Sequence, residues 1–278
     1  MGGIATARAG IFNPVAGYSY TNAEAATLVA AMSSAPEDTR KGVIDTCIGA
    51  IKTAGVWSKL DCLWIRAAHD SQAALLDWKR LSDSTAVNSP TFTTDRGFTG
   101  DGSTSYINTN FTPSTDGVNY IRDSACMGAY LNAGTDTANS SVISIGYYVS
   151  GGTRQARITP WQSATPGSGV IGRINDSTAT TVGTVTTRFG LTAVNRSAST
   201  AVEVYRNGSS IGTSSVASST LGTIDAYELG FNNNGALGGA NDNRSAASFV
   251  GGSLTSTEHA DLFTAIEAYL DAVGAGVV

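Results

Sequence analysis

The stretch Phe189–Ser215 constrains the fold most strongly. Two strand-like runs, Phe189–Asn195 and Ala201–Tyr205, flank a short polar turn. In the second run apolar and polar residues alternate, which is typical of a strand with one buried and one solvated face. The chain then reverses through Asn207-Gly208, whose preference for positive φ suits a two-residue type I′ turn. The pattern predicts the central hairpin of an antiparallel sandwich, with the other strands added around it.

Short runs rich in Val, Ile, Tyr and Phe recur along the chain between turn-forming residues. No helical period separates the later runs, so they predict a sandwich or jelly roll rather than a parallel α/β sheet. Thr91–Phe98 and Ser103–Phe111 are expected to pair around Gly100-Asp101-Gly102. The other predicted strands are Leu60–Ala67, Ala125–Leu131, Val142–Val149, Gln155–Pro160, Gly169–Asn175, Thr180–Thr187, Ser210–Ser214, Ala226–Phe231 and Ala247–Leu254.

Three helix starts carry the capping-box pattern, in which a hydroxyl residue is followed three positions later by Glu. They are Thr21 with Glu24, Ser34 with Glu37, and Thr255 with Glu258. An apolar stripe at helical spacing follows each of them. The first two predict a helical hairpin that ends near Thr53, and the third predicts a C-terminal helix that packs on the sandwich.

Composition excludes several function classes. Of 278 residues only 14% are charged, and the net charge of −5 provides no basic surface for nucleic acid.

Three widely spaced cysteines, Cys47, Cys62 and Cys126, form neither a disulfide framework nor a zinc signature. Buried free thiols are favoured, with one bridging pair left open. No apolar run has transmembrane length, and Met1–Gly17 lacks the features of a signal peptide, so we expect no membrane insertion.

The N-terminal residues form an arm without any hydrophobic period. Residues 1–20 combine Gly, Ala and Pro14 with a few apolar side chains, namely Ile4, Ile11 and Phe12. Such a segment orders only against a surface. We predict that these three residues dock on a neighbouring subunit; the alternative is an arm that folds over its own domain.

Three segments, in order, resemble laminin-G-like jelly rolls. Gly97–Ile107 resembles an opening "F.GDG.SYI" strand pair, and Val202–Gly208 resembles a "VxLYxNG" hairpin. Ser248–Thr255, followed by Glu258, resembles a closing "F.G..LT..E" passage from strand to helix. The resemblance covers roughly residues 57–278. It implies a mainly β, concanavalin A-like jelly-roll sandwich over 57–278, preceded by an arm and helical hairpin over 1–56 and closed by the C-terminal helix.

Together with the helical N-terminal segment, the chain resembles phage virion proteins such as tail fibres, head fibres and decoration subunits. The resemblance implies a module that binds carbohydrate or a host surface. It also implies a homo-oligomer, with a trimer favoured, that is displayed on the virion surface. The lack of signal-peptide features predicts that the chain is made in the host cytoplasm.

Catalytic groups are scarce. His69 and His259 are the whole histidine supply, and the neighbours of His69 in sequence point away from it on an extended chain. Asp225-x-x-Glu228 is the nearest approach to a glycosidase acid pair, but an offset of three places the two carboxylates on opposite faces of a strand. We therefore predict that the chain is not an enzyme and needs no cofactor. Calcium held through Asp242 or Asp101 is a weaker alternative.

Sugar binding needs an aromatic platform and amide or carboxylate groups. The best candidates are Trp161, Asn232, Asn233, Asn241 and Asp242, although Asn also serves simply to make turns. The sequence thus predicts a virion protein with an outward-facing, lectin-like domain for host-surface or glycan adhesion. The alternatives are a decoration or cement protein without sugar binding and, third, a glycan-degrading enzyme.

Overall fold

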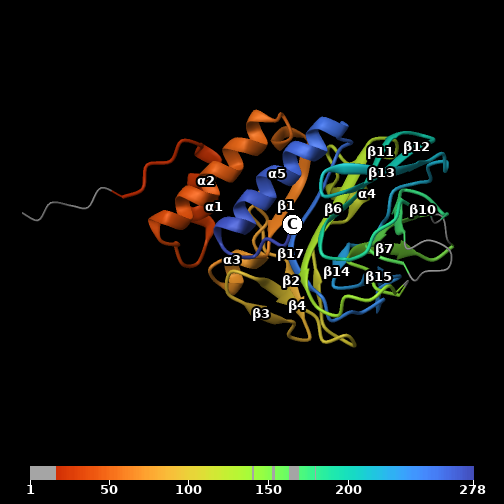
Figure 1. Ribbon diagram of the computed structural model, residues 1–278, viewed down its shortest axis with the longest axis horizontal. Helices are drawn as coiled ribbons and strands as arrows, with labels where there is room; N and C mark the ends of the chain where they lie inside the picture. Colours follow the sequence, from red (N-terminus) through yellow and green to blue (C-terminus); the bar gives the residue numbers. More distant parts are fainter. Residues whose placement is uncertain (1–16, 140, 152–153, 163–168, 179) are drawn as a thin grey trace, which may run out of the picture.

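The computed structural model describes residues 17–278 apart from 140, 152–153, 163–168 and 179. Two antiparallel sheets form a sandwich, and helices cover one side of it (Figure 1). The predicted mainly β sandwich with a C-terminal helix is confirmed. The helices are α1 (Ala23–Ala31), α2 (Asp38–Thr53), α3 (Ser71–Leu75), α4 (Pro113–Asp116) and α5 (Ser256–Ala272), with a 3₁₀ turn η1 (Trp57–Lys59).

The first sheet has the strand order β13-β12-β11-β6-β17-β4-β3 over the described residues, and β1 also pairs with β17. Asn207 and Gly208 have φ values of 49° and 75°, so the predicted turn is confirmed. The predicted central position of this hairpin is wrong, because β6 and β17 occupy the middle of the sheet. The strands are β1 (Leu60–Ile65), β3 (Thr91–Thr93), β4 (Gly97–Thr99), β6 (Ala125–Ala133), β11 (Gly190–Ala198), β12 (Ala201–Arg206), β13 (Ser209–Ser214) and β17 (Arg244–Gly251).

The second sheet has the order β10-β9-β8-β7-β14-β5-β2 over the described residues, with β15 and β16 added beside β7. Its short strands β2 and β16 were not predicted from the sequence, and the predicted strand Ala226–Phe231 divides into β14 and β15. The strands are β2 (Thr85–Val87), β5 (Tyr106–Asn108), β7 (Ile145–Val149), β8 (Arg154–Thr159), β9 (Val170–Ile174), β10 (Thr180–Val182), β14 (Tyr227–Glu228), β15 (Phe231–Asn233) and β16 (Ala236–Gly238).

The predicted pairing of Thr91–Phe98 with Ser103–Phe111 is wrong. Strand β4 belongs to the first sheet and β5 to the second, so the turn between them crosses from one layer to the other. Its path is held by long-range contacts, in which Gly100 N and Gly102 N both donate at 3.2 Å to the carbonyls of Asn243 and Asn241 respectively. A contact of this kind leaves no local signal in the sequence.

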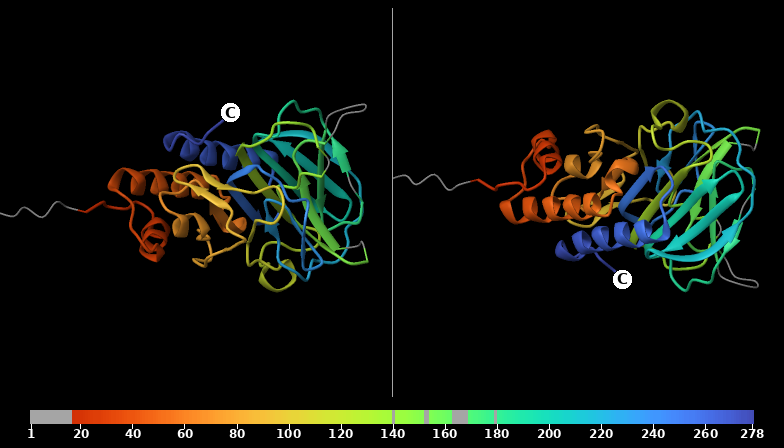
Figure 2. Two further views of the ribbon diagram at one scale, coloured as in Figure 1. Left: turned by 90° about the horizontal axis from the view of Figure 1, so that it is seen from below. Right: turned by 90° about the horizontal axis from the view of Figure 1, so that it is seen from above.

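Two apolar layers hold the structure together. Inward side chains of both sheets, among them Met127, Val194 and Ile158, form the sandwich core. Alternate side chains of the first sheet, such as Tyr130 and Phe249, point the other way and pack under α1, α2 and α5. Figure 2 shows these helices together on one side of the sandwich. The first sheet is therefore the middle of three layers, which explains why β1 is buried along its whole length.

Only the third capping box forms. In α5, Thr255 accepts from the Glu258 amide while the Glu258 carboxylate accepts from the Thr255 amide. The predicted boxes at Thr21 and Ser34 are wrong: Asn22 and Glu37 are the N-cap residues of α1 and α2, and neither side chain makes a capping hydrogen bond.

At the start of α1, a carboxylate from the neighbouring helix α2, that of Asp45, takes the place of the predicted capping box. Asp45, on α2, is only 2% exposed and accepts from the backbone amides of Thr21 and Asn22 at 2.7 and 2.8 Å. Tyr18 Oη also donates to it, at 3.1 Å. Burial raises the pKa of this carboxyl, but the hydrogen bonds outweigh that effect and lower the pKa below its ordinary value.

The division into residues 1–56 and 57–278 stays a prediction. In the structure, α1 and α2 share one buried cluster with β1, β17 and α5. The three cysteines are buried and free, as predicted. No helix in the described part of the chain is long and apolar enough to cross a membrane.

Candidate functional site

Two of the predicted ligand residues use their amides inside the chain. Asn232 donates to the Asp225 carbonyl at 2.9 Å and accepts from the Gly235 amide at 2.7 Å. Asn241 donates to the Ile143 carbonyl at 2.8 Å and accepts from Asn243. Both are 3% exposed. Their carboxamides hold loops in place, so a ligand would have to displace hydrogen bonds that the fold already uses.

Each of the other three predicted residues makes its own contacts within the described part of the chain. Trp161 is half-buried against the sandwich core, and its Nε1 has no partner among the described residues. Asn233 is exposed on β15, in register with Tyr148 of β7. Asp242 is exposed and accepts from the Thr135 hydroxyl. The predicted assembly residues Ile4, Ile11 and Phe12 lie outside the described residues.

The candidate calcium ligand Asp101 organises its own turn. Its carboxylate accepts from the amides of Ser103, Thr104 and Ser105 at 2.8 to 2.9 Å. These hydrogen bonds hold the pKa of Asp101 far below its ordinary value. Among the residues that the structure describes, no group of three His, Cys, Asp or Glu side chains is placed to hold a metal ion.

The candidate catalytic residues are engaged in the fold. His259 is 2% exposed and stacks on the Tyr205 ring with a centroid separation of 3.9 Å. His69 contacts the Ser34 carbonyl at 2.8 Å and the Asp70 carboxylate at 3.2 Å, so the expectation that His69 and Asp70 point apart is wrong. Asp70 also accepts from the Ala73 amide as the N-cap of α3.

Glu228 belongs to a buried ion pair between the sheets. Its carboxylate accepts from Arg66 Nη2 at 2.6 Å and from the hydroxyls of Ser245 and Ser248 at 2.8 and 2.6 Å. Asp225, which the sequence analysis already separates from Glu228, accepts from Asn108 at 3.0 Å. The two carboxylates therefore serve separate structural contacts.

A different surface has the properties of a binding site. On β8 and β9 the side chains of Ala156, Ile158 and Ile174 enter the sandwich core. Because side chains alternate along a strand, Arg157 and Arg173 project from the opposite face of the second sheet. Figure 1 shows that this sheet, with β7, β10 and β15, lies on the side away from the helices. We call Tyr148, Arg157, Arg173 and Phe231 the arginine–aromatic face.

Close backbone packing positions Arg157. A Cβ at Gly146, directly opposite on β7, would lie 2.5 Å from the Arg157 Cβ, so only glycine leaves room for this side chain. The guanidinium lies over the Phe231 ring, 5.1 Å from its centroid, in a cation–π contact. Arg173 is the direct cross-strand partner of Arg157.

Two like charges opposite each other destabilise a sheet unless something neutralises them. Over the described residues no carboxylate forms an ion pair with either arginine, and Arg173 Nε has no hydrogen-bond partner. Burial lowers the pKa of both guanidinium groups, and for Arg157 the neighbouring Arg173 lowers it further. The nearby Asp176 carboxylate is already bound to Arg196 at 3.3 Å. Asp176 stabilises both guanidinium charges from a distance, but within the described residues no carboxylate is in ion-pair contact with Arg157 or Arg173.

A hollow of about 210 Å³ adjoins Arg157. Phe231 and Ile171 supply apolar contact area, and Ser141 and Thr159 supply hydroxyls. Chemically, this surface offers apolar contact with part of the Phe231 ring, hydroxyls for polar contacts and guanidinium groups that form strong, directional hydrogen bonds with anions. The hollow is also lined by Ile143 and Gly239.

Sequence reasoning missed these arginines, although part of the signal was present. Arg157 lies between Ala156 and Ile158 in a run predicted as a strand, and the alternation already indicates that it points away from the core. What the alternation lacks is register. Whether Arg157 pairs with Arg173 depends on which residues of β8 and β9 lie opposite each other, and alternation alone does not specify that register.

Comparisons with known proteins give similarity of fold at low sequence identity. Domain 4 of an extracellular GH43 arabinanase from Geobacillus stearothermophilus, solved with arabinotriose, matches 73% of this chain and 98% of its own at 15% identity and a TM-score of 0.47. A Trypanosoma rangeli sialidase, solved with the inhibitor DANA, matches 80% of this chain at 12% identity and a TM-score of 0.45. This match spans 38% of the sialidase chain.

The CBM40 of a Ruminococcus gnavus IT-sialidase, solved with α2,3-sialyllactose, matches 49% of this chain and 78% of its own at 14% identity and a TM-score of 0.36. At TM-scores below 0.5, none of these similarities carries a function to this chain. No protein-family model matches the sequence. No curated protein matches it either.

Proposed function

We propose that this chain is an adhesive β-sandwich protein that binds an acidic saccharide on the arginine–aromatic face. The observation that carries the proposal is the pair of opposed arginines, Arg157 and Arg173, neither of which has an ion-pair contact with a carboxylate within the described residues. A ligand carboxylate, sulfate or phosphate would supply the missing charge through charge-assisted hydrogen bonds.

A saccharide suits the remainder of the surface. The part of the Phe231 ring that lines the hollow, together with Ile171, offers apolar contact for the C–H face of a sugar, and Ser141 and Thr159 offer hydroxyls for its polar edge. The hollow of about 210 Å³ is smaller than the roughly 300–1,000 Å³ of typical drug-sized sites, which favours contact with one sugar unit of a longer chain. Asn233, next to Tyr148 in register, extends the polar edge of the site.

Glycan-array binding with arginine variants tests the proposal. Wild type should bind carboxylated or sulfated glycans and should not bind their neutral counterparts. Its binding should weaken as the salt concentration is raised. Arg157→Gln and Arg173→Gln should each weaken binding about tenfold or more, because a hydrogen bond to a charged group contributes about 1.5–3 kcal/mol.

Arg122→Gln is the matched control. Arg122 is exposed and its guanidinium donates to Ser218 at 3.0 Å, so the substitution removes the same charge elsewhere. Equal binding of neutral and acidic glycans, or unchanged binding by the Arg157→Gln, Arg173→Gln double variant, would rule out the site. Trp161→Ala tests the residue that the sequence favoured: if binding is lost there and retained in the arginine variants, the ligand uses the Trp161 loop instead.

The setting we propose is a phage virion, on the resemblance described from the sequence. Residues 1–16 would attach the chain to neighbouring subunits, and the second sheet would face the host. A cement protein without sugar binding is the second candidate, supported by the buried cluster that α1 and α2 share with the first sheet. Particles lacking the protein would then lose stability, while the isolated protein would bind no glycan.

A further inference from the structure

An apolar groove runs between α2 and α5 on the side of the molecule opposite the arginine–aromatic face. Its central hollow of about 270 Å³ is lined by Gly42, Val43, Ala50, Ala265 and Ala268, with Tyr269 beside them. A second hollow shares Ala50, Ala265 and Ala268 with it, and a third shares Val43, so the three are continuous. Small side chains on both helices leave this seam open to solvent.

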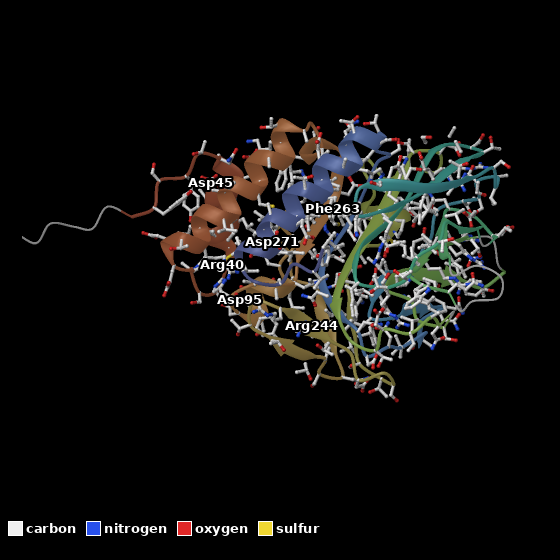
Figure 3. All side chains as sticks on the ribbon, viewed as in Figure 1. Arg40, Asp45, Asp95, Arg244, Phe263 and Asp271 are labelled. Carbon is white, nitrogen blue, oxygen red and sulfur yellow. The ribbon has the colours of Figure 1, made fainter. Side chains whose placement is uncertain are left out.

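The described chain begins beside this groove. The Tyr18 ring packs against Gly42, 3.5 Å from where a Cβ would be, and its hydroxyl donates to Asp45. Figure 3 shows Asp45 on α2, with Asp271 and Phe263 on the adjacent α5. Residues 1–16, which precede this anchor, contain Ile4, Ile11 and Phe12 among Gly and Ala. Their apolar side chains match the apolar lining of the groove.

Charge is complementary as well. Arg8 is the only charged side chain in residues 1–16. The groove carries exposed acids toward its two ends, Glu37 at one and Asp261 at the other, and neither has an ion-pair partner in the described part of the chain. At the Glu37 end, Arg40 is already neutralised by Asp95 at 2.6 Å, and Figure 3 shows these two side chains together.

How far an arm can extend along the groove distinguishes the arm of a second copy from the chain's own arm. The 16 residues of α2 span about 24 Å, and an extended segment of 16 residues spans about 50 Å. The chain's own arm leaves Tyr18 beside Gly42, about 6 Å from the start of α2, so in one direction it can cover at most the remaining distance of about 17 Å and cannot also reach the Glu37 end. An arm from a second copy enters at one end, fills the groove with about seven residues and has the rest to bridge the subunits.

We propose that the groove between α2 and α5 binds the N-terminal arm, residues 1–16, of a second copy of this chain. Ile4 fills the apolar seam and Arg8 meets an acid at its end. Each copy both gives and receives an arm, so a reciprocal two-fold dimer or a closed ring satisfies every groove. The proposal rests on the proposed assembly role of the arm and is independent of saccharide binding.

Cross-linking between two differently tagged full-length chains tests it. One chain carries Ile4→Cys and the other Ala50→Cys, both with Cys47→Ser because Cys47 lines the central hollow. The other native thiols are buried, so the introduced ones react. A link between the two chains is the expected result. Ala30→Cys, exposed on α1 and outside the three hollows, is the control acceptor and should give no link. Equal linking to Ala30→Cys, or none to Ala50→Cys, overturns the proposal.

Two further measurements test whether the chain's own arm fills the groove and whether the arm binds another surface. A single chain with both Ile4→Cys and Ala50→Cys that links only within itself shows that the chain's own arm fills the groove, which also overturns the proposal. Mass measurement in solution should show an oligomer for wild type and Ala30→Gln, and monomers for Ala268→Gln and for the chain without residues 1–16. If removal of residues 1–16 dissociates the oligomer while Ala268→Gln does not, the arm assembles the protein through another surface.

Discussion

At the scale of single residues, the buried ion pair between the sheets is the feature with the largest desolvation cost. Arg66 follows β1 in the first sheet and Glu228 lies on β14 in the second, and both side chains are wholly buried. Arg66 also donates to the Ser84 hydroxyl at 3.1 Å and to the Ala74 carbonyl at 2.9 Å. The pair is satisfied on both sides, so it specifies how the layers align rather than providing a reactive carboxylate.

Removal of one member of this pair should be severe. Glu228→Ala leaves the Arg66 charge buried without its partner, and we expect a loss of about 3–5 kcal/mol in the free energy of unfolding, measured by urea denaturation. Glu203→Ala, a partly exposed carboxylate on β12, is the control and should cost far less. The double variant Arg66→Met, Glu228→Leu should recover much of the loss. A Glu228→Ala protein as stable as wild type would contradict this account.

His259 should make stability depend on pH. Burial against Tyr205 lowers the pKa of His259 from an ordinary value of 6.5 to about 3, with Glu258 opposing the shift. Between these values the unfolded chain binds a proton that the folded chain does not, so the stabilisation is complete above 6.5 and is lost as pH falls.

The measurement compares the free energy of unfolding at about pH 7.5 and about pH 5.5, a window in which carboxylates of ordinary pKa stay ionised. Asp176, whose pKa burial raises to about 6, titrates in this window in wild type and variant alike, so the comparison of the two isolates His259. Wild type should be less stable at the lower pH. His259→Phe preserves the ring stack and should show a flatter profile. The same slope in both proteins would assign the pH dependence to other groups.

At the scale of elements, helix starts that look alike in sequence are built differently. Thr255 caps α5 with its own side chain, whereas Asp45 of α2 accepts the amides of Thr21 and Asn22 at the start of α1. A capping box is a local pattern, and a carboxylate brought in by tertiary packing can replace it. Glu24, freed from the box, instead pairs with Lys52 at 2.7 Å.

Matched substitutions should separate the two helix starts. Thr255→Ala removes a capping hydroxyl and should cost about 1 kcal/mol, which lowers the melting temperature by about 2 °C in a chain of this size. Thr21→Ala removes a hydroxyl that makes no capping contact and should change the melting temperature by a few tenths of a degree at most. Thermal denaturation followed by circular dichroism measures both, and equal effects would show that Thr21 caps α1 after all.

The hairpin β12–β13 shows how one dipeptide serves two roles. Asn207 and Gly208 reverse the chain, as the sequence predicts. In addition, a Cβ at Gly208 would lie 2.9 Å from the Ala260 Cα and 3.1 Å from the Phe263 Cβ, so the turn packs closely under α5. The turn therefore needs glycine both for its positive φ and for the close approach of the helix.

At the scale of the whole molecule, the first sheet is covered on both faces. Trp64 and Val250 enter the sandwich core, while their strand neighbours Leu63 and Phe249 pack under the helices. The helices are therefore part of the core of the molecule. This arrangement also separates the two proposed surfaces, with the arginine–aromatic face on the second sheet and the α2–α5 groove on the far side of the first.

The shared core should make the protein unfold in one step. Because Leu28, Ile48 and Leu262 belong to the same buried cluster as strands β1 and β17, loss of the helices exposes the sheet. We expect a single calorimetric transition whose enthalpy equals the van't Hoff value. Two separate transitions would indicate that residues 1–56 form an independent domain.

Local patterns in the sequence were enough to determine the kinds of element. Alternation identified most strands, Asn207-Gly208 identified a turn, and Thr255 with Glu258 identified the start of α5, because each depends only on backbone geometry and near neighbours. The tertiary structure decided the rest. It placed the hairpin at an edge, divided β4 and β5 between two sheets, set Arg157 opposite Arg173, and opened the groove beside Gly42. These features depend on register and on contacts between residues far apart in the chain, which periodicity does not encode.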